Sequence, residues 1–180
     1  DIGDQAGHER APSRRVSAVD ERPSPRPRQW QRNPGGGRER PQGTGAPAVG
    51  ETYRLGDLVL SVDGPLRRYA SPNDQSIVIT VAGPARSMLL SGDIETHAQA
   101  DLAHLRAEVL KVPHQGAGTS DPRWLEDVGS QLAVISVGPN QFGHPVEWVI
   151  DTLDDTNLVL RTDEAGDVVV DLAGPSPLGG

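Results

Sequence analysis

The sequence has no cysteine and very few aromatic residues. Of its 180 residues, 3% are aromatic and 35% are hydrophobic, which is low for a globular chain. The lack of Cys excludes disulfides and thiolate metal sites, so any metal would be held by His, Asp or Glu. No apolar run reaches the roughly 18–20 residues that a membrane span needs. No signal-peptide pattern opens the chain, and we expect it to be soluble.

Charge divides the chain into two parts. Residues 1–50 contain nine Arg, no Lys and six acidic residues, a net charge of +3, whereas the other 130 residues carry −11. Seven Pro, eight Gly and little apolar surface mean that residues 1–50 cannot offset the entropy of ordering by burial. We therefore expect a disordered arm at 1–50, a folded domain at 51–173 and a flexible tail at 174–180. The arm would either attract nucleic-acid phosphates through its Arg residues or act only as a solvated linker.

The hydrophobic pattern after residue 50 predicts alternating strands and helices. Strands are expected at 58–62, 77–81, 88–90, 109–112, 132–137, 158–161 and 168–172. Helices are expected at 94–105, at 121–128 and from Pro145 onward. The resulting order, βββαβαβαββ, is typical of an α/β layered domain. The short turn after residue 81 predicts that the second and third strands pair as a hairpin.

Polar residues stand where several of these strands end, which is where ligands gather in open α/β sheets. Asp93 is either an N-cap of the following helix or a carboxylate ligand for a metal. His114 is either a metal ligand or acid–base group, or a surface loop residue. His144 precedes Pro145, so its backbone should be extended and its ring could point into a cleft. The alternative for the loop from Asn140 to His144 is a structural role in capping the next helix.

A second group of candidate ligands lies on the first predicted helix. His97, Asp101 and His104 follow the spacing i, i+4, i+7 and could share one helical side. This spacing could bind a metal, but no fourth ligand supports it. We interpret the three as exposed polar residues beside the apolar stripe.

Several motifs occur in a fixed order between residues 55 and 163. They are Leu-Gly-Asp at 55–57, Asn-Asp-Gln-Ser at 73–76, Ser-Met-Leu-Leu-Ser-Gly-Asp at 87–93, Val-Leu-Lys-Val-Pro-His at 109–114, Ala-Val-Ile-Ser-Val-Gly at 133–138, Asn-x-x-Gly-His-Pro at 140–145 and Arg-Thr-Asp at 161–163. Together they resemble ComEC-type competence proteins. Those proteins join a membrane channel for single-stranded DNA to a metallo-β-lactamase-like domain that is regarded as a metal-dependent nuclease.

The resemblance implies roles for five residues. Asp93 matches a Gly-Asp motif whose carboxylate would bridge two metal ions, and His114 would ligate one of them. His144 matches the Gly-His-Pro motif and would contact the substrate or support the site. Lys111 and Asn140 would assist it. The implied cofactor is a divalent metal, Zn or Mn, the implied partner is DNA, and the implied location is the extracytoplasmic side of a bacterial membrane protein.

The sequence also departs from the family's pattern. Gln115 and Ala117 replace the second His and the Ser of a His-His-Gly-Ser motif, and the His-x-His-x-Asp-His motif is absent, since no two His are separated by one residue. A two-metal hydrolase needs several ligands for each ion. We therefore expect residues 51–173 to form the C-terminal half of an αββα sandwich and to have no hydrolase activity on their own. Its exposed sheet face would promote self-association or binding of a chain that supplies the other half. The alternative function is a non-catalytic nucleic-acid-binding module that uses the basic arm.

Overall fold

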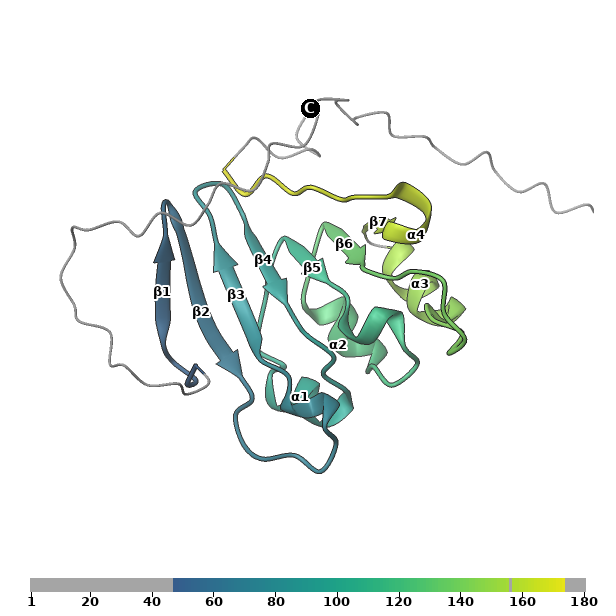
Figure 1. Cartoon of the computed structure of the whole chain (residues 1–180), viewed down its shortest axis with the longest axis horizontal. Helices are drawn as coiled ribbons and strands as arrows, with labels where there is room; N and C mark the ends of the chain where they lie inside the picture. Colours follow the sequence, from purple (N-terminus) through teal and green to yellow (C-terminus); the bar gives the residue numbers. More distant parts are fainter. Residues whose placement is uncertain (1–46, 156, 174–180) are drawn as a thin grey trace, which may run out of the picture. The chain divides into compact units, whose positions relative to one another are not determined.

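The computed structural model describes residues 47–155 and 157–173, which form one β-sheet with helices against one of its faces (Figure 1). This confirms the α/β class predicted from the sequence. Residues 47–50 form a loop that ends in a turn. The rest of the predicted disordered arm and the predicted tail at 174–180 lie outside the described residues. Within the described ranges, no helix is both long and apolar enough to cross a membrane.

The described residues contain seven strands, which lie in the sheet in their order along the chain. They are β1 (Thr52–Leu55), β2 (Leu58–Gly64), β3 (Val78–Ala82), β4 (Ser87–Leu90), β5 (Val109–Lys111), β6 (Leu132–Ile135) and β7 (Leu158–Arg161). Strands β1 to β4 pair antiparallel, which confirms the predicted hairpin of β3 and β4. Strands β4 to β7 are parallel.

Helices connect the parallel strands. The described residues contain α1 (Thr96–Asp101), α2 (Pro122–Asp127), α3 (Glu147–Asp154) and, after β7, α4 (Thr162–Ala165), with 3₁₀ turns η1 (Asn73–Gln75) and η2 (Pro113–Gly116). Each of the first three lies between one parallel strand and the next strand along the sheet. Right-handed crossovers that all step in one direction place their helices on the same face, and Figure 1 shows α1, α2 and α3 together on one side.

The main core lies between this face and the helices. Strand residues alternate in direction, so every second one points to the helices. The buried residues of this core include Val78, Leu89, Leu110, Ile135, Ile94, Ala98, Leu102, Trp124, Leu125, Val149 and Leu153. Burial of these side chains stabilises the fold by roughly 25 cal/mol per Å² of apolar area removed from water.

The opposite face of the sheet carries a second apolar cluster, which includes Val81, Val109, Leu132 and Val134. The segment 168–172 packs on it through Val168, Val170 and Leu172. Figure 1 shows this yellow segment running back toward the turn between β3 and β4, where the N–H of Ala85 donates to the Leu172 carbonyl over 3.1 Å.

The prediction of a strand at 168–172 was therefore wrong, because this segment pairs in register with none of the described strands. Its alternation of apolar and polar residues reflects contact with the sheet face, and an extended chain lying across a sheet shows the same period as a strand. Strand β1, in contrast, forms a strand without an alternating pattern of burial, and the sequence analysis missed it. All four of its residues are exposed, so no burial pattern marks it.

Candidate functional site

The carboxyl ends of the four parallel strands meet at one edge of the sheet and border an open cavity of about 340 Å³. Its lining comes from the last residue of β5 and from the segments that follow β4, β5, β6 and β7: Asp93, Lys111, Gln115, Ser136, Val137, Gly138 and Thr162. Two predicted site residues, Asp93 and Lys111, thus share one cavity. The cavity lies where α/β sheets bind their ligands.

Lys111 and Asp93 face each other in this cavity. The Lys111 Nζ donates a 2.9 Å hydrogen bond to the Gly92 carbonyl and lies 3.9 Å from the Asp93 carboxylate. Burial lowers the pKa of Lys111, and the nearby Asp93 carboxylate opposes this effect without cancelling it. The side chain of Asp93 is half exposed, so it is open to a ligand that enters the cavity.

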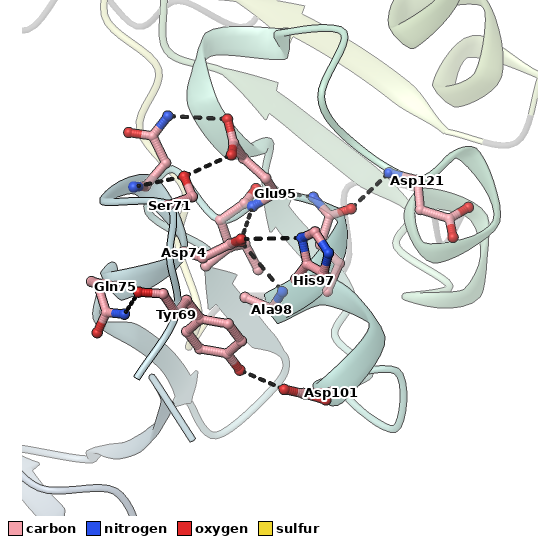
Figure 2. A network of polar contacts seen from close by, with 12 residues as sticks. Tyr69, Ser71, Asp74, Gln75, Glu95, His97, Ala98, Asp101 and Asp121 are labelled. Atoms are coloured by element: carbon pink, nitrogen blue, oxygen red, sulfur yellow. Dashed lines mark hydrogen bonds and ion pairs between the residues drawn. The ribbon is translucent and has the colours of Figure 1, made fainter. Parts of the chain in front are cut away.

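Asp93 does not cap helix α1. The helix begins at Thr96, and a different carboxylate serves its first turn: Asp74 Oδ1 accepts hydrogen bonds from the N–H of Glu95 at 2.7 Å and of Ala98 at 3.3 Å (Figure 2). Asp74 is only 1% exposed. The interpretation of Asp93 as an N-cap was wrong, because a residue distant in sequence supplies that carboxylate. Sequence reasoning missed Asp74, although it lies within the Asn-Asp-Gln-Ser motif.

His114 lies in a strained turn after β5. Its φ is 47° and that of Gln115 is 56°, a left-handed conformation that costs non-Gly residues energy and concentrates at functional sites. The His114 Nδ1 is 3.7 Å from Glu95 Oε1 and 3.5 Å from Asn73 Nδ2. The turn thus directs the imidazole toward a carboxylate that the sequence analysis did not consider.

Glu95 is the centre of a polar cluster at the start of α1. Its carboxylate accepts hydrogen bonds from Ser71 Oγ at 2.8 Å and Asn73 Nδ2 at 3.1 Å (Figure 2). Burial acts to raise the pKa of Glu95, but the hydrogen bonds from Asn73, Ser71 and Thr119 outweigh it, and the pKa is lowered. Glu95 is thereby kept ionised beside His114.

His144 lies against His114, although the two are on separate loops. Their ring centroids are 5.5 Å apart in an edge-to-face arrangement. A close contact of η2 with the next loop brings them together: a Cβ on Gly116 would lie 2.6 Å from Pro145 Cβ, and the Val146 N–H donates to the Gly116 carbonyl over 2.9 Å. The His144 Nδ1 is buried and has no hydrogen-bond partner among the described residues.

Asn140 uses its side chain to hold its own loop. Its Nδ2 donates to the carbonyls of Gly138 at 3.0 Å and His144 at 2.8 Å. Its Oδ1 accepts from the N–H groups of Phe142 and His144, both at 3.1 Å. The amide is therefore fully occupied within the loop, and its support for the site consists of fixing the loop that carries His144.

The described donors do not make up a complete metal centre. Among residues 47–155 and 157–173, no group of three His, Asp or Glu residues could hold an ion. The carboxylate of Asp93 faces Lys111, and the ring of His114 faces Glu95. A two-metal hydrolase site would need further ligands.

The three residues around helix α1 do not form a site either. His97 lies 3.9 Å from the Asp74 carboxylate and is largely exposed. Asp101 accepts hydrogen bonds from Arg67 Nε at 2.6 Å and from the Tyr69 hydroxyl at 2.8 Å. His104 is exposed and lies beyond the end of the helix. The interpretation of these residues as exposed polar groups is confirmed for the two histidines, whereas Asp101 is partly buried and engaged.

A carboxylate, an amine and two imidazoles thus lie at the carboxyl edge of the parallel strands, the place where α/β proteins usually bind ligands. No family model matches the chain. The chain is 31% identical over 129 residues to ComE operon protein 3 of Bacillus subtilis (strain 168), which covers 66% of this chain and 16% of that protein. It is 31% identical over 108 residues to the competence protein ComA of Neisseria gonorrhoeae, which covers 56% of this chain and 16% of that protein. The resemblance to ComEC-type competence proteins is confirmed, over a small part of their length.

Proposed function

We propose that residues 51–173 correspond to the C-terminal half of a metallo-β-lactamase-type sandwich, part of a ComEC-like domain of hydrolase lineage that acts on DNA during its uptake. The observation that carries this proposal is the cavity shared by Asp93 and Lys111. The loops that follow β5 and β6 carry His114 and His144, whose rings contact each other. The similarity to competence proteins supplies the biological context. By that context, the domain works on the extracytoplasmic side of a bacterial membrane.

In this proposal, Asp93 and His114 each supply one ligand to a divalent-metal site that further residues complete. Zn and Mn both accept imidazole and carboxylate ligands, and when bound they would supply Lewis-acid chemistry at a phosphate. Lys111, held by the Gly92 carbonyl, offers a positive charge to a phosphate oxygen. Without the additional ligands the chain does not hydrolyse DNA.

The second face of the sheet fits a partner that completes the domain. Its half-buried apolar residues are Leu58, Leu60, Ile79, Met88, Leu90, Leu158 and Leu160, and the segment 168–172 covers part of them. Apolar surface of this kind favours association. The partner is a chain that supplies the other half of the sandwich, or a second copy of this one.

The proposed metal site is tested by calorimetry of the full chain with Mn²⁺ and Zn²⁺. We expect binding that is lost in both Asp93→Ala and His114→Ala and retained in His104→Ala, which removes an exposed imidazole away from the cavity. Binding that is equal in all four proteins would contradict a role for Asp93 and His114 as ligands. Cleavage of DNA by the native chain alone, with either metal, would contradict the proposal that the site is incomplete.

The charge of residues 1–50 favours a second candidate function, binding of nucleic acid without cleavage. Each phosphate neutralised by an Arg releases counterions, so the affinity would fall steeply with salt. Replacement of the nine Arg of this segment by Gln in the full chain should then abolish DNA binding. Binding that survives this replacement would place the contact in the folded domain instead.

A further inference from the structure

Three rings form a row at the carboxyl edge of the sheet. Phe142 stacks on His144 with centroids 6.0 Å apart and planes inclined by 21°. His144 meets His114 edge to face, and His114 faces the carboxylate of Glu95 at 3.7 Å. The row therefore links a loop on the protein surface to the polar cluster at the start of α1.

The outer ring of this row is open to solvent. Phe142 is 72% exposed, and among the described residues His144 is the ring paired with it. It is also the one Phe in a sequence in which aromatics make up 3%. Burial therefore does not account for the use of an aromatic residue here, since the ring removes little apolar area from water.

The exposed ring is nevertheless held in place. Asn140 accepts the Phe142 N–H and fixes both ends of the loop through the Gly138 and His144 carbonyls. The stack on His144 orients the ring itself. A ring fixed before binding loses little entropy when a flat ligand stacks on it, which is the general advantage of preorganisation.

We propose that Phe142 is a stacking platform for a nucleobase of single-stranded DNA, an inference that rests on the proposed action on DNA. Every base has a π-face, so aromatic stacking holds single strands without regard to sequence. Gly138, at the start of the same loop, lines the cavity that contains Lys111. A strand that stacks one base on Phe142 therefore lies on the loop whose first residue borders that cavity.

The experiment uses ¹⁹F NMR on the full chain without added metal. Because the sequence has a single Phe, growth on 4-fluorophenylalanine labels position 142 alone. The labelled protein is titrated with a short oligodeoxyadenylate and with an abasic deoxyribose-phosphate strand of equal length. We expect the base ring current to shift the resonance with the adenylate and leave it in place with the abasic strand.

The affinity is measured in parallel by fluorescence anisotropy. We expect Phe142→Ala to bind the adenylate about tenfold more weakly and Phe142→Trp to retain the native affinity. Both variants should bind the abasic strand as the native chain does. Tyr53→Ala, which removes another exposed aromatic side chain, on β1, serves as the control and should bind like the native chain. Because Phe142 is exposed, its substitution should leave the melting temperature unchanged.

Two results would overturn the inference, and they distinguish a failure of the stacking role from a failure of the proposed action on DNA. Equal binding of both strands, with a stationary ¹⁹F resonance, would remove the stacking role of Phe142 and leave DNA binding intact. No binding of either strand at low salt would remove the proposed action on DNA and the stacking role with it.

Discussion

The carboxylate of Asp74 accepts a 2.7 Å hydrogen bond from the backbone N–H of Glu95, which lies 21 residues further along the chain. The contact ties the 3₁₀ turn η1 to the start of helix α1. It also fixes the backbone of Glu95, whose side chain faces His114. One buried carboxylate thus joins the stability of the fold to the geometry of the candidate site.

Replacement of Asp74 should destabilise the protein. Asp74→Ala leaves the N–H groups of Glu95 and Ala98 without their acceptor, and we expect a loss of about 1–3 kcal/mol in the free energy of unfolding. Urea denaturation measures it. Glu126→Ala, which removes an exposed carboxylate on α2, is the control and should change stability by less than about 0.5 kcal/mol. A fully stable Asp74→Ala variant would mean that water replaces this cap without cost.

Glu95 should make the stability of the protein depend on acidic pH. Its pKa in the folded chain is lowered from the ordinary value of 4.5, so the ionised form stabilises the fold. This contribution is fully present above pH 4.5 and is lost as the pH falls through the lower folded pKa. We expect the melting temperature of Glu95→Gln to fall less between neutral pH and pH 3 than that of the native chain. The melting temperature of the control Glu126→Gln should change with pH as that of the native chain does. If the melting temperature of Glu95→Gln falls as much as that of the native chain, Glu95 is not a source of this pH dependence.

Asn140 should control the order of the loop that carries Phe142 and His144. Asn140→Ala removes the acceptor of both N–H groups. We expect their hydrogen exchange to speed up by about fivefold to tenfold, as the loss of about 1–1.5 kcal/mol of hydrogen bonding implies. Amide exchange followed by NMR measures the rates. Gln141→Ala, at an exposed neighbouring position, should leave them unchanged. Equal rates in both variants would show that the loop keeps its shape without Asn140.

The sequence predicted those parts of the fold in which burial and periodicity agree. Strands β3 to β7 and helices α2 and α3 were placed closely, because short apolar runs mark the strands and apolar residues at helical spacing mark the helices. Strand β1 was missed because it is exposed along its whole length. The segment 168–172 was mistaken for a strand because periodicity shows which side chains are buried. It does not show whether the backbone forms hydrogen bonds with a neighbouring strand.

The candidate site was predicted in its location and only partly in its members. Lys111, which only the resemblance to ComEC-type proteins had suggested, lines the same cavity as Asp93. The strand-end rule had placed Asp93, His114 and His144 on the loops at this edge of the sheet. It could not identify Asp74 or Glu95, because their roles depend on a loop that folds back onto α1 from before β3. A contact of that range leaves no local pattern in the sequence.

Gly83 should be essential for the packing of the C-terminal segment on the sheet. A Cβ at this position would lie 2.6 Å from the Leu172 carbonyl oxygen and 2.7 Å from Leu172 Cβ. Gly83→Ala must therefore displace Leu172, which is 8% exposed, and weaken the hydrogen bond from Ala85 to its carbonyl. We expect a loss of about 1–3 kcal/mol in the free energy of unfolding, as overpacking costs elsewhere.

The matched control for this substitution is Gly138→Ala, since a Cβ there meets no atom within 4 Å and should change stability little. Urea denaturation compares the two variants. If Leu172 and its segment come away from the sheet in Gly83→Ala, the apolar face beneath becomes available, and the variant should also associate at lower concentration than the native chain. Sedimentation velocity measures this second effect. A Gly83→Ala protein as stable and as monodisperse as Gly138→Ala would show that the segment 168–172 contributes nothing to covering that face.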